Sequence, residues 1–176
     1  MRYIQGIGSF TTFDEFLQAT DEPLFAYYKS IQKEQSIEEI FHTRLLEAYN
    51  HYLIIGGMPA AVEKYRATGS IDDVMDEHRA IIEQYKLDFT QYEEENRKLI
   101  ITHIYELIPA ELNEKNKRFM IADIKKGLRY DRVEDSFTWL WKAGVALGVF
   151  NTTEPTAPLM LNEKSTLFKL FLSDVG

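Results

Sequence analysis

The sequence contains no cysteine, which excludes disulfide bridges and thiolate metal sites. A reducing cytoplasm suits such a chain. No apolar run is long enough to span a bilayer, and the amino-terminal residues lack the apolar stretch of a signal peptide. We therefore expect a soluble, cytoplasmic protein that makes no membrane contact.

The motifs of common catalytic sites are also missing. No G-x-x-x-x-G-K-[ST] loop is present to hold a nucleotide, and no serine lies in a G-x-S-x-G turn. The histidines, which are His42, His51, His78 and His103, lack the close spacing of metal ligands. We expect no enzyme, no cofactor and no metal, with His78 and His103 as structural residues at the edge of a core.

Charge and apolar residues are abundant but unevenly placed. Hydrophobic residues make up 45% of the chain, which is typical of a globular protein. The net charge is −8, yet residues 1–96 hold 8 Lys plus Arg against 18 Asp plus Glu, whereas residues 97–147 hold 10 against 7. This reversal indicates two surfaces with different partners. We predict an acidic helical subdomain over 1–96 and a second subdomain over 97–176.

Apolar spacing and end signals predict a mainly helical fold. Capping boxes begin at Thr12 and Ser36, and Ser70 caps another helix. Pro109 is expected to end the helix that precedes it. The predicted helices cover residues 13–19, 22–32, 37–55, 59–66, 71–92, 99–108, 120–124 and 130–142.

Two apolar segments, 145–150 and 167–172, are predicted to be the strands of a hairpin with a long loop. Three helices followed by a hairpin are the element order of a winged helix-turn-helix. The predicted fold is thus a helical subdomain followed by a winged helix.

Several short motifs together carry a resemblance to a known family. They are, in chain order, Ser9–Leu17 (SFTTFDEFL), Tyr52–Pro59 (YLIIGGMP), Tyr85–Tyr92 (YKLDFTQY), Ile108–Leu112 (IPAEL), Trp139–Gly144 (WLWKAG) and Phe168–Gly176 (FKLFLSDVG). In this order and spacing, the chain resembles the region of unknown function that follows the ATPase core in a family of prokaryotic AAA-type ATPases.

This resemblance implies that the chain is the middle of a longer protein. The family has a phosphate-binding loop ahead of this region and a PD-(D/E)xK nuclease-like region after it, and neither is present here. The resemblance therefore implies a non-catalytic interaction or regulatory module, whose partner would be an ATPase core or another protein.

A basic group provides the alternative function. The predicted turn and the start of the recognition helix carry four basic residues, Lys125, Lys126, Arg129 and Arg132. At this position they could contact the phosphates of DNA. Acidic side chains at the same helix start would repel DNA, and many winged helices bind proteins instead. Both a DNA-binding winged helix and a protein-binding one stay open.

The loop Gly56-Gly57-Met58-Pro59 also has two interpretations. Two glycines permit close approach by a partner or a phosphate. The structural interpretation is simpler, because glycine can end one helix and proline can begin the next. We favour the structural interpretation.

Overall fold

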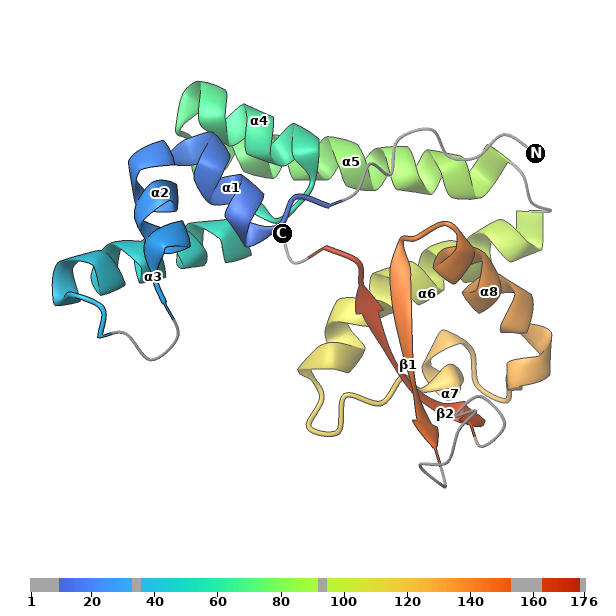
Figure 1. The fold of residues 1–176 in the computed structure, drawn as a ribbon. Helices are drawn as coiled ribbons and strands as arrows, with labels where there is room; N and C mark the ends of the chain where they lie inside the picture. The colour runs from blue at the N-terminus through green and yellow to red at the C-terminus, as the bar shows by residue number, and fades with distance from the viewer. Residues whose placement is uncertain (1–9, 33–35, 92–94, 153–162, 175–176) are drawn as a thin grey trace. The chain divides into compact units, whose positions relative to one another are not determined.

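The computed structural model describes residues 10–32, 36–91, 95–152 and 163–174. The fold is mainly helical with a small two-stranded antiparallel sheet (Figure 1). Its elements are α1 (Phe13–Thr20), α2 (Glu22–Ser30), α3 (Glu39–Ile55), α4 (Pro59–Thr68), α5 (Ile71–Gln91), α6 (Glu95–Asn113), α7 (Ile121–Ile124), α8 (Glu134–Lys142), β1 (Ala146–Thr152) and β2 (Glu163–Leu172). Among the described residues, no helix combines the length and the hydropathy needed to cross a membrane.

The chain divides into two compact units. Unit 1 comprises Met1–Gln84 with Asp174–Gly176, and unit 2 comprises Tyr85–Ser173. Along the chain, the boundary falls within α5. The division after residue 96 stays a prediction of how the chain is organised into subdomains.

In unit 1, α1 to α4 pack around a small apolar core. Thr12 begins α1 with the predicted capping box, in which its side chain accepts from the backbone N–H of Glu15 and the Glu15 carboxylate accepts from the backbone N–H of Thr12. Asp21 caps α2 by accepting from the N–H of Leu24 at 3.0 Å. The core is formed by Phe16, Ile55, Ala61, Val62 and Val74.

The capping box predicted at Ser36 does not form. The helix begins at Glu39 with Glu38 as its N-cap, and no side-chain hydrogen bond caps it. A Ser-x-x-Glu pattern indicates only a local preference for a helix start, and packing of the helix can override it.

In unit 2, α6 packs against α7, α8 and β2, and α8 also contacts β1. Its interior is dominated by aromatic rings. Phe137 lies 5.1 Å from Phe168 and 5.4 Å from Phe119, measured between ring centroids, and both contacts are edge-to-face. Such pairs contribute beyond their buried area, so these rings hold the helices on the hairpin.

Two predictions for α6 are wrong. Pro109 lies inside the helix, which continues to Asn113. The buried stripe consists of Ile101, Ile104 and Ile108, whereas Leu99 and His103, whose spacing in the sequence fits the same stripe as Ile104 and Ile108, are exposed. Proline removes one backbone donor, and packing of the residues on both sides of it offsets that loss.

The predicted helix over 130–142 forms in two pieces. A 3₁₀ turn covers Tyr130–Arg132, and α8 follows at Glu134. Val133, Phe137 and Leu140 are buried, and Tyr130 and Trp141 are partly buried. Both predicted strands are present and pair antiparallel, with Ala146 opposite Leu172 and Phe150 opposite Phe168. Of the residues predicted to form the loop between them, 151–152 and 163–166 belong to the strands, and 153–162 lie outside the described residues.

Candidate functional site

The loop Gly56–Pro59 joins α3 to α4 and is enclosed by backbone hydrogen bonds. Gly56 ends α3 with φ 76° and ψ −174°, a conformation open essentially to glycine alone, and Pro59 begins α4. The N–H of Thr11 donates to Gly57 O at 2.7 Å. An added Cβ on Gly57 would lie 2.7 Å from Thr11 O, so only glycine fits there without a shift.

Asp174 completes this loop. The N–H of Gly57 donates to Asp174 Oδ1 at 2.6 Å, and the hydroxyl of Tyr52 donates to Thr11 O at 2.9 Å. Burial raises the pKa of Tyr52, and the negative charge of Asp174 raises it further. Three motifs that are far apart in the sequence therefore meet in one hydrogen-bonded structure, which supports the structural interpretation of the two glycines.

His78 also has a structural role in unit 1. Its Nε2 lies 2.8 Å from the carbonyl oxygen of Ile55, the last residue of α3. A carbonyl can only accept, so Nε2 carries the proton and ties α5 to the end of α3. In unit 2, His103 is exposed.

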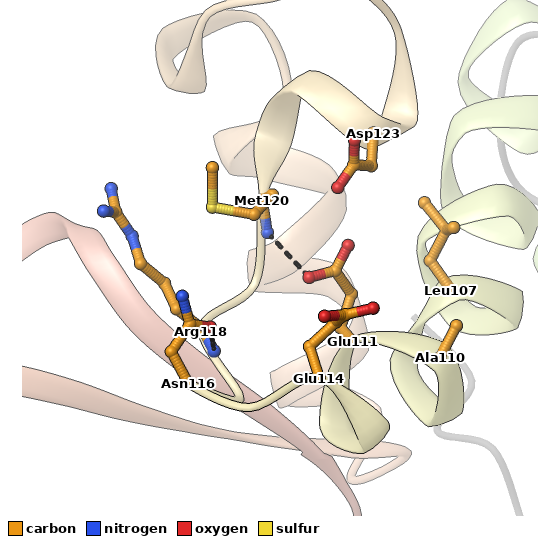
Figure 2. Close-up of a pocket in the computed structure, with 8 residues that line it drawn as sticks. All are labelled: Leu107, Ala110, Glu111, Glu114, Asn116, Arg118, Met120 and Asp123. Carbon is orange, nitrogen blue, oxygen red and sulfur yellow. Dashed lines mark hydrogen bonds between the residues drawn. The ribbon is translucent and has the colours of Figure 1, made fainter.

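An acidic pocket in unit 2 was not predicted. Residues from the end of α6, the connection that follows and α7 surround a hollow of about 410 Å³ (Figure 2). Glu111, which is 6% exposed, accepts from the backbone N–H of Met120 at 3.2 Å. Figure 2 shows the carboxyl groups of Glu111 and Asp123 turned toward each other.

Burial raises the pKa of Glu111, and so do a hydrogen bond with Asp123 and the negative charges of Asp123 and Glu114. The bond from Met120 acts in the opposite direction. Glu111 lies in the IPAEL motif, but nothing in its spacing distinguishes it from a surface residue. Its burial depends on α6 continuing past Pro109, which the sequence argued against.

The carboxyl groups of the pocket are not arranged as a set of metal ligands. Within the described ranges, no group of three or more His, Asp or Glu side chains could hold a metal ion. The hydrogen bonds of Glu111 instead join the end of α6 to the start of α7.

The four basic residues predicted to contact DNA are all exposed. Lys125 and Lys126 follow α7 directly, Arg129 precedes the 3₁₀ turn and Arg132 ends it. Arg129 Nε lies 3.5 Å from Asp131 Oδ1, and Arg97 lies 3.3 Å from Asp135. Two of the acidic side chains near the group are therefore within ion-pair distance of arginine.

One face of α3 is unexpectedly apolar. The stripe that faces the core contains Phe41, Leu45, Ala48, Tyr52 and Ile55, none of which is exposed. The outward face carries Leu46, Tyr49, Leu53 and Ile54, which are 40–49% exposed. We call these four residues the α3 outer face. Apolar spacing in the sequence places Ile40 and Tyr49 on the same stripe as Phe41, Leu45, Ala48 and Tyr52, but Ile40 and Tyr49 are exposed.

The fold and these sites define a mainly helical protein of two compact units, with no nucleotide-binding loop in its sequence. The chain belongs to the family described as a domain of unknown function (DUF8612), which matches residues 46–176. No curated protein matches the chain, and no solved structure does. The family description names no activity, so the relation to ATPases stays a prediction from the motifs.

Proposed function

We propose that the chain is a non-catalytic interaction or regulatory module that packs on the core of an AAA-type ATPase. The observation that carries this proposal is the α3 outer face. A helix that is apolar on both faces is usually buried on both, and one face of α3 is exposed. Contiguous exposed apolar patches are typical of protein interfaces, whereas single exposed apolar residues are ordinary.

The spacing of the α3 outer face makes it one surface. Leu46, Tyr49 and Leu53 follow one another at three and four residues, so their side chains lie in a row along the helix. Tyr49 is partly fixed by an edge-to-face contact with Phe13 of α1, with centroids 5.2 Å apart. Exposed Glu39 and Glu47 on the same helix favour a partner with basic residues around an apolar centre.

The test measures binding of the full chain to a P-loop ATPase core of the resembled family, supplied as a separate polypeptide. The variant Leu46→Glu/Leu53→Glu places two charges in the centre of the α3 outer face. Central interface residues commonly contribute about 2 kcal/mol or more, so we expect affinity to fall at least about thirtyfold by calorimetry.

The matched control is Leu99→Glu, because Leu99 is an exposed leucine on α6 of unit 2. It should bind like the unsubstituted chain. Equal binding by the α3 variant and the control would refute docking through α3, and absence of any complex would refute the ATPase-core proposal.

A second candidate function is DNA binding by unit 2, and a specific observation favours it. Three helices followed by a hairpin, in the order α6, α7, α8, β1 and β2, support a winged helix-turn-helix, and the N–H of Phe119 donates to Phe168 O at 3.0 Å. That bond lies on the edge of β2 that faces away from β1, and it ties the segment before α7 to the hairpin. The exposed basic group would then lie beside the recognition helix α8.

A mobility-shift titration at several salt concentrations tests this candidate. Four phosphate contacts predict a slope of log affinity against log salt of about −3.6. The variant Lys125→Ala/Lys126→Ala/Arg129→Ala/Arg132→Ala should abolish that dependence. The control Lys29→Ala/Arg44→Ala/Lys64→Ala/Arg66→Ala removes the same charge from unit 1 and should leave it. No binding at low salt would exclude the candidate.

A further inference from the structure

Among the described residues of unit 2, β1 pairs with β2 along one edge and with no strand along the other. In an antiparallel pair, successive residues alternate between exchanging backbone hydrogen bonds with the opposite strand and turning their N–H and C=O groups away from it. Ser173 N–H donates to Val145 O at 3.1 Å, and the register places these two residues opposite each other. By alternation, Ala146, Gly148 and Phe150 turn their backbone groups outward from β1.

The same alternation holds on β2. Phe168 lies opposite Phe150, and its carbonyl accepts from Phe119 on the outer edge of β2. The edge of β2 is thus partly paired. In the part of the chain that the structure describes, no backbone bond from another element reaches Ala146, Gly148 or Phe150 of β1.

β1 also lacks the features that normally protect an edge strand. Its sequence, ALGVFNT, has no charged residue and no proline. Leu147 and Val149 project from the face opposite the core and are 55% and 54% exposed. An uncharged edge strand with open backbone groups and exposed apolar side chains is a template for another strand.

We propose that the edge of β1 pairs with β1 of a second copy of this chain, antiparallel, about a two-fold axis at Gly148. In this register, Gly148 lies opposite Gly148, and Ala146 lies opposite Phe150 of the other copy. The outward N–H and C=O groups of Ala146, Gly148 and Phe150 then all form hydrogen bonds with the other copy.

The side chains of β1 are self-complementary in the same register. Leu147 of one copy lies opposite Val149 of the other, on the exposed face and in a position where cross-strand side chains are close. The two-fold axis repeats this contact, so four exposed apolar side chains cover one another. No like charges meet, because the strand has none. A self-paired edge is an isologous interface, the arrangement of most homodimers.

The proposal is independent of the α3 outer face, which lies in unit 1 and is proposed to bind a different protein. The first measurement is sedimentation equilibrium of the full chain over a wide concentration range. A reversible dimer is expected. A monomer at all concentrations through the millimolar range would overturn the proposal.

A charge exchange tests the register. Leu147→Lys and Val149→Glu each place a charge opposite an apolar residue and should raise the dimer dissociation constant about tenfold or more. When the two variants are mixed, the introduced lysine faces the introduced glutamate and the remaining Leu147 faces Val149. The mixture should therefore form a heterodimer more tightly than either variant forms a homodimer.

The control Leu99→Lys changes a leucine of α6 that is 67% exposed, against 55% for Leu147, and should dimerise like the unsubstituted chain. Gly148 itself is left unchanged, because an added Cβ would meet Trp141 at 3.1 Å. Circular dichroism confirms that each variant is folded.

Amide hydrogen exchange identifies the surface directly. Dimerisation should slow exchange at Ala146, Gly148 and Phe150, whose amides gain partners, and change little at Leu147 and Val149, which already bond to β2. A dimer without this alternating protection, or a mixture that associates no better than its components, would place the interface elsewhere and overturn the proposal.

Discussion

The glycine loop of unit 1 and the aromatic centre of unit 2 are each stabilised by a different kind of contact. In unit 1, a glycine loop is enclosed by backbone hydrogen bonds from Thr11 and a carboxylate bond from Asp174. In unit 2, the centre is a group of aromatic rings around Phe137 and Phe168. The glycine loop has no room for an added side-chain atom at Gly57. The aromatic centre instead depends on large side chains, so it is damaged when one of them is truncated. Single substitutions should therefore damage the units in opposite ways.

The largest effect is expected from Phe137→Ala in unit 2. Phe137 is fully buried and contacts the rings of Phe119, Phe168 and Trp141. Its removal should cost about 3–5 kcal/mol of unfolding free energy, measured by urea denaturation, because a cavity is left and ring contacts are lost. A loss below about 1 kcal/mol, the cost of an average substitution, would show that these rings do not dominate unit 2.

The next largest effect is expected from Gly57→Ala in unit 1. The added methyl would lie 2.7 Å from Thr11 O, a backbone atom that cannot turn aside like a side chain. We expect a loss of about 2–3 kcal/mol from overpacking, measured by the same denaturation experiment.

Ala60, which is exposed on α4, provides the control for an added atom. The change Ala60→Ser should alter stability by no more than about 0.5 kcal/mol. If Gly57→Ala were equally harmless, the loop would have more room than the structure gives it.

These two positions also show what the sequence could reveal. The glycines, the proline and the Thr12 capping box act through their own backbone, so local patterns located the start of α1, the end of α3 and the start of α4 correctly. The partners of Gly57 could not be predicted, because Thr11 and Asp174 reach it only through the tertiary fold.

The wrong predictions for α3 and α6 share one physical cause, which is that tertiary packing overrides a local sequence preference. Pro109 weakens a helix locally, but buried Ile108 and Glu111 on either side keep α6 intact. Ser36 offers a cap that α3 does not use. Leu99 and His103 fit the spacing of an inward stripe, yet the helix is rotated so that Ile101 is buried instead. Periodicity gives a helix its stripe only to within about one residue, and packing decides which residue faces the core.

A smaller effect is expected from Asp174→Ala. The change leaves the N–H of Gly57 without the carboxylate that accepts from it at 2.6 Å. The expected loss is about 1–2 kcal/mol, because a part-buried donor loses a charged acceptor. Asp174→Asn keeps an oxygen acceptor and should lose less. Equal losses in the two variants would mean that the hydrogen bond itself contributes little.

The smallest effect concerns Glu111 of unit 2 and appears as a change in pH dependence. Burial, followed by the contacts with Asp123, raises the pKa of Glu111 in the folded state above its unfolded value. Between these two values the folded protein binds a proton that the unfolded chain does not, so this group makes stability fall as pH rises through that window. Glu111→Gln removes the titration and keeps an acceptor for the N–H of Met120. Relative to the unsubstituted protein, the variant should therefore gain stability as pH is raised from about 4, near the ordinary value of a glutamate, to neutral. Thermal unfolding at a series of pH values measures this difference in stability.

The variant Asp123→Asn removes the charge beside Glu111. It should gain stability over the same pH range, relative to the unsubstituted protein, but by less than Glu111→Gln. A constant difference across the series would mean that the Glu111 carboxyl group is as well solvated in the folded protein as in the unfolded chain.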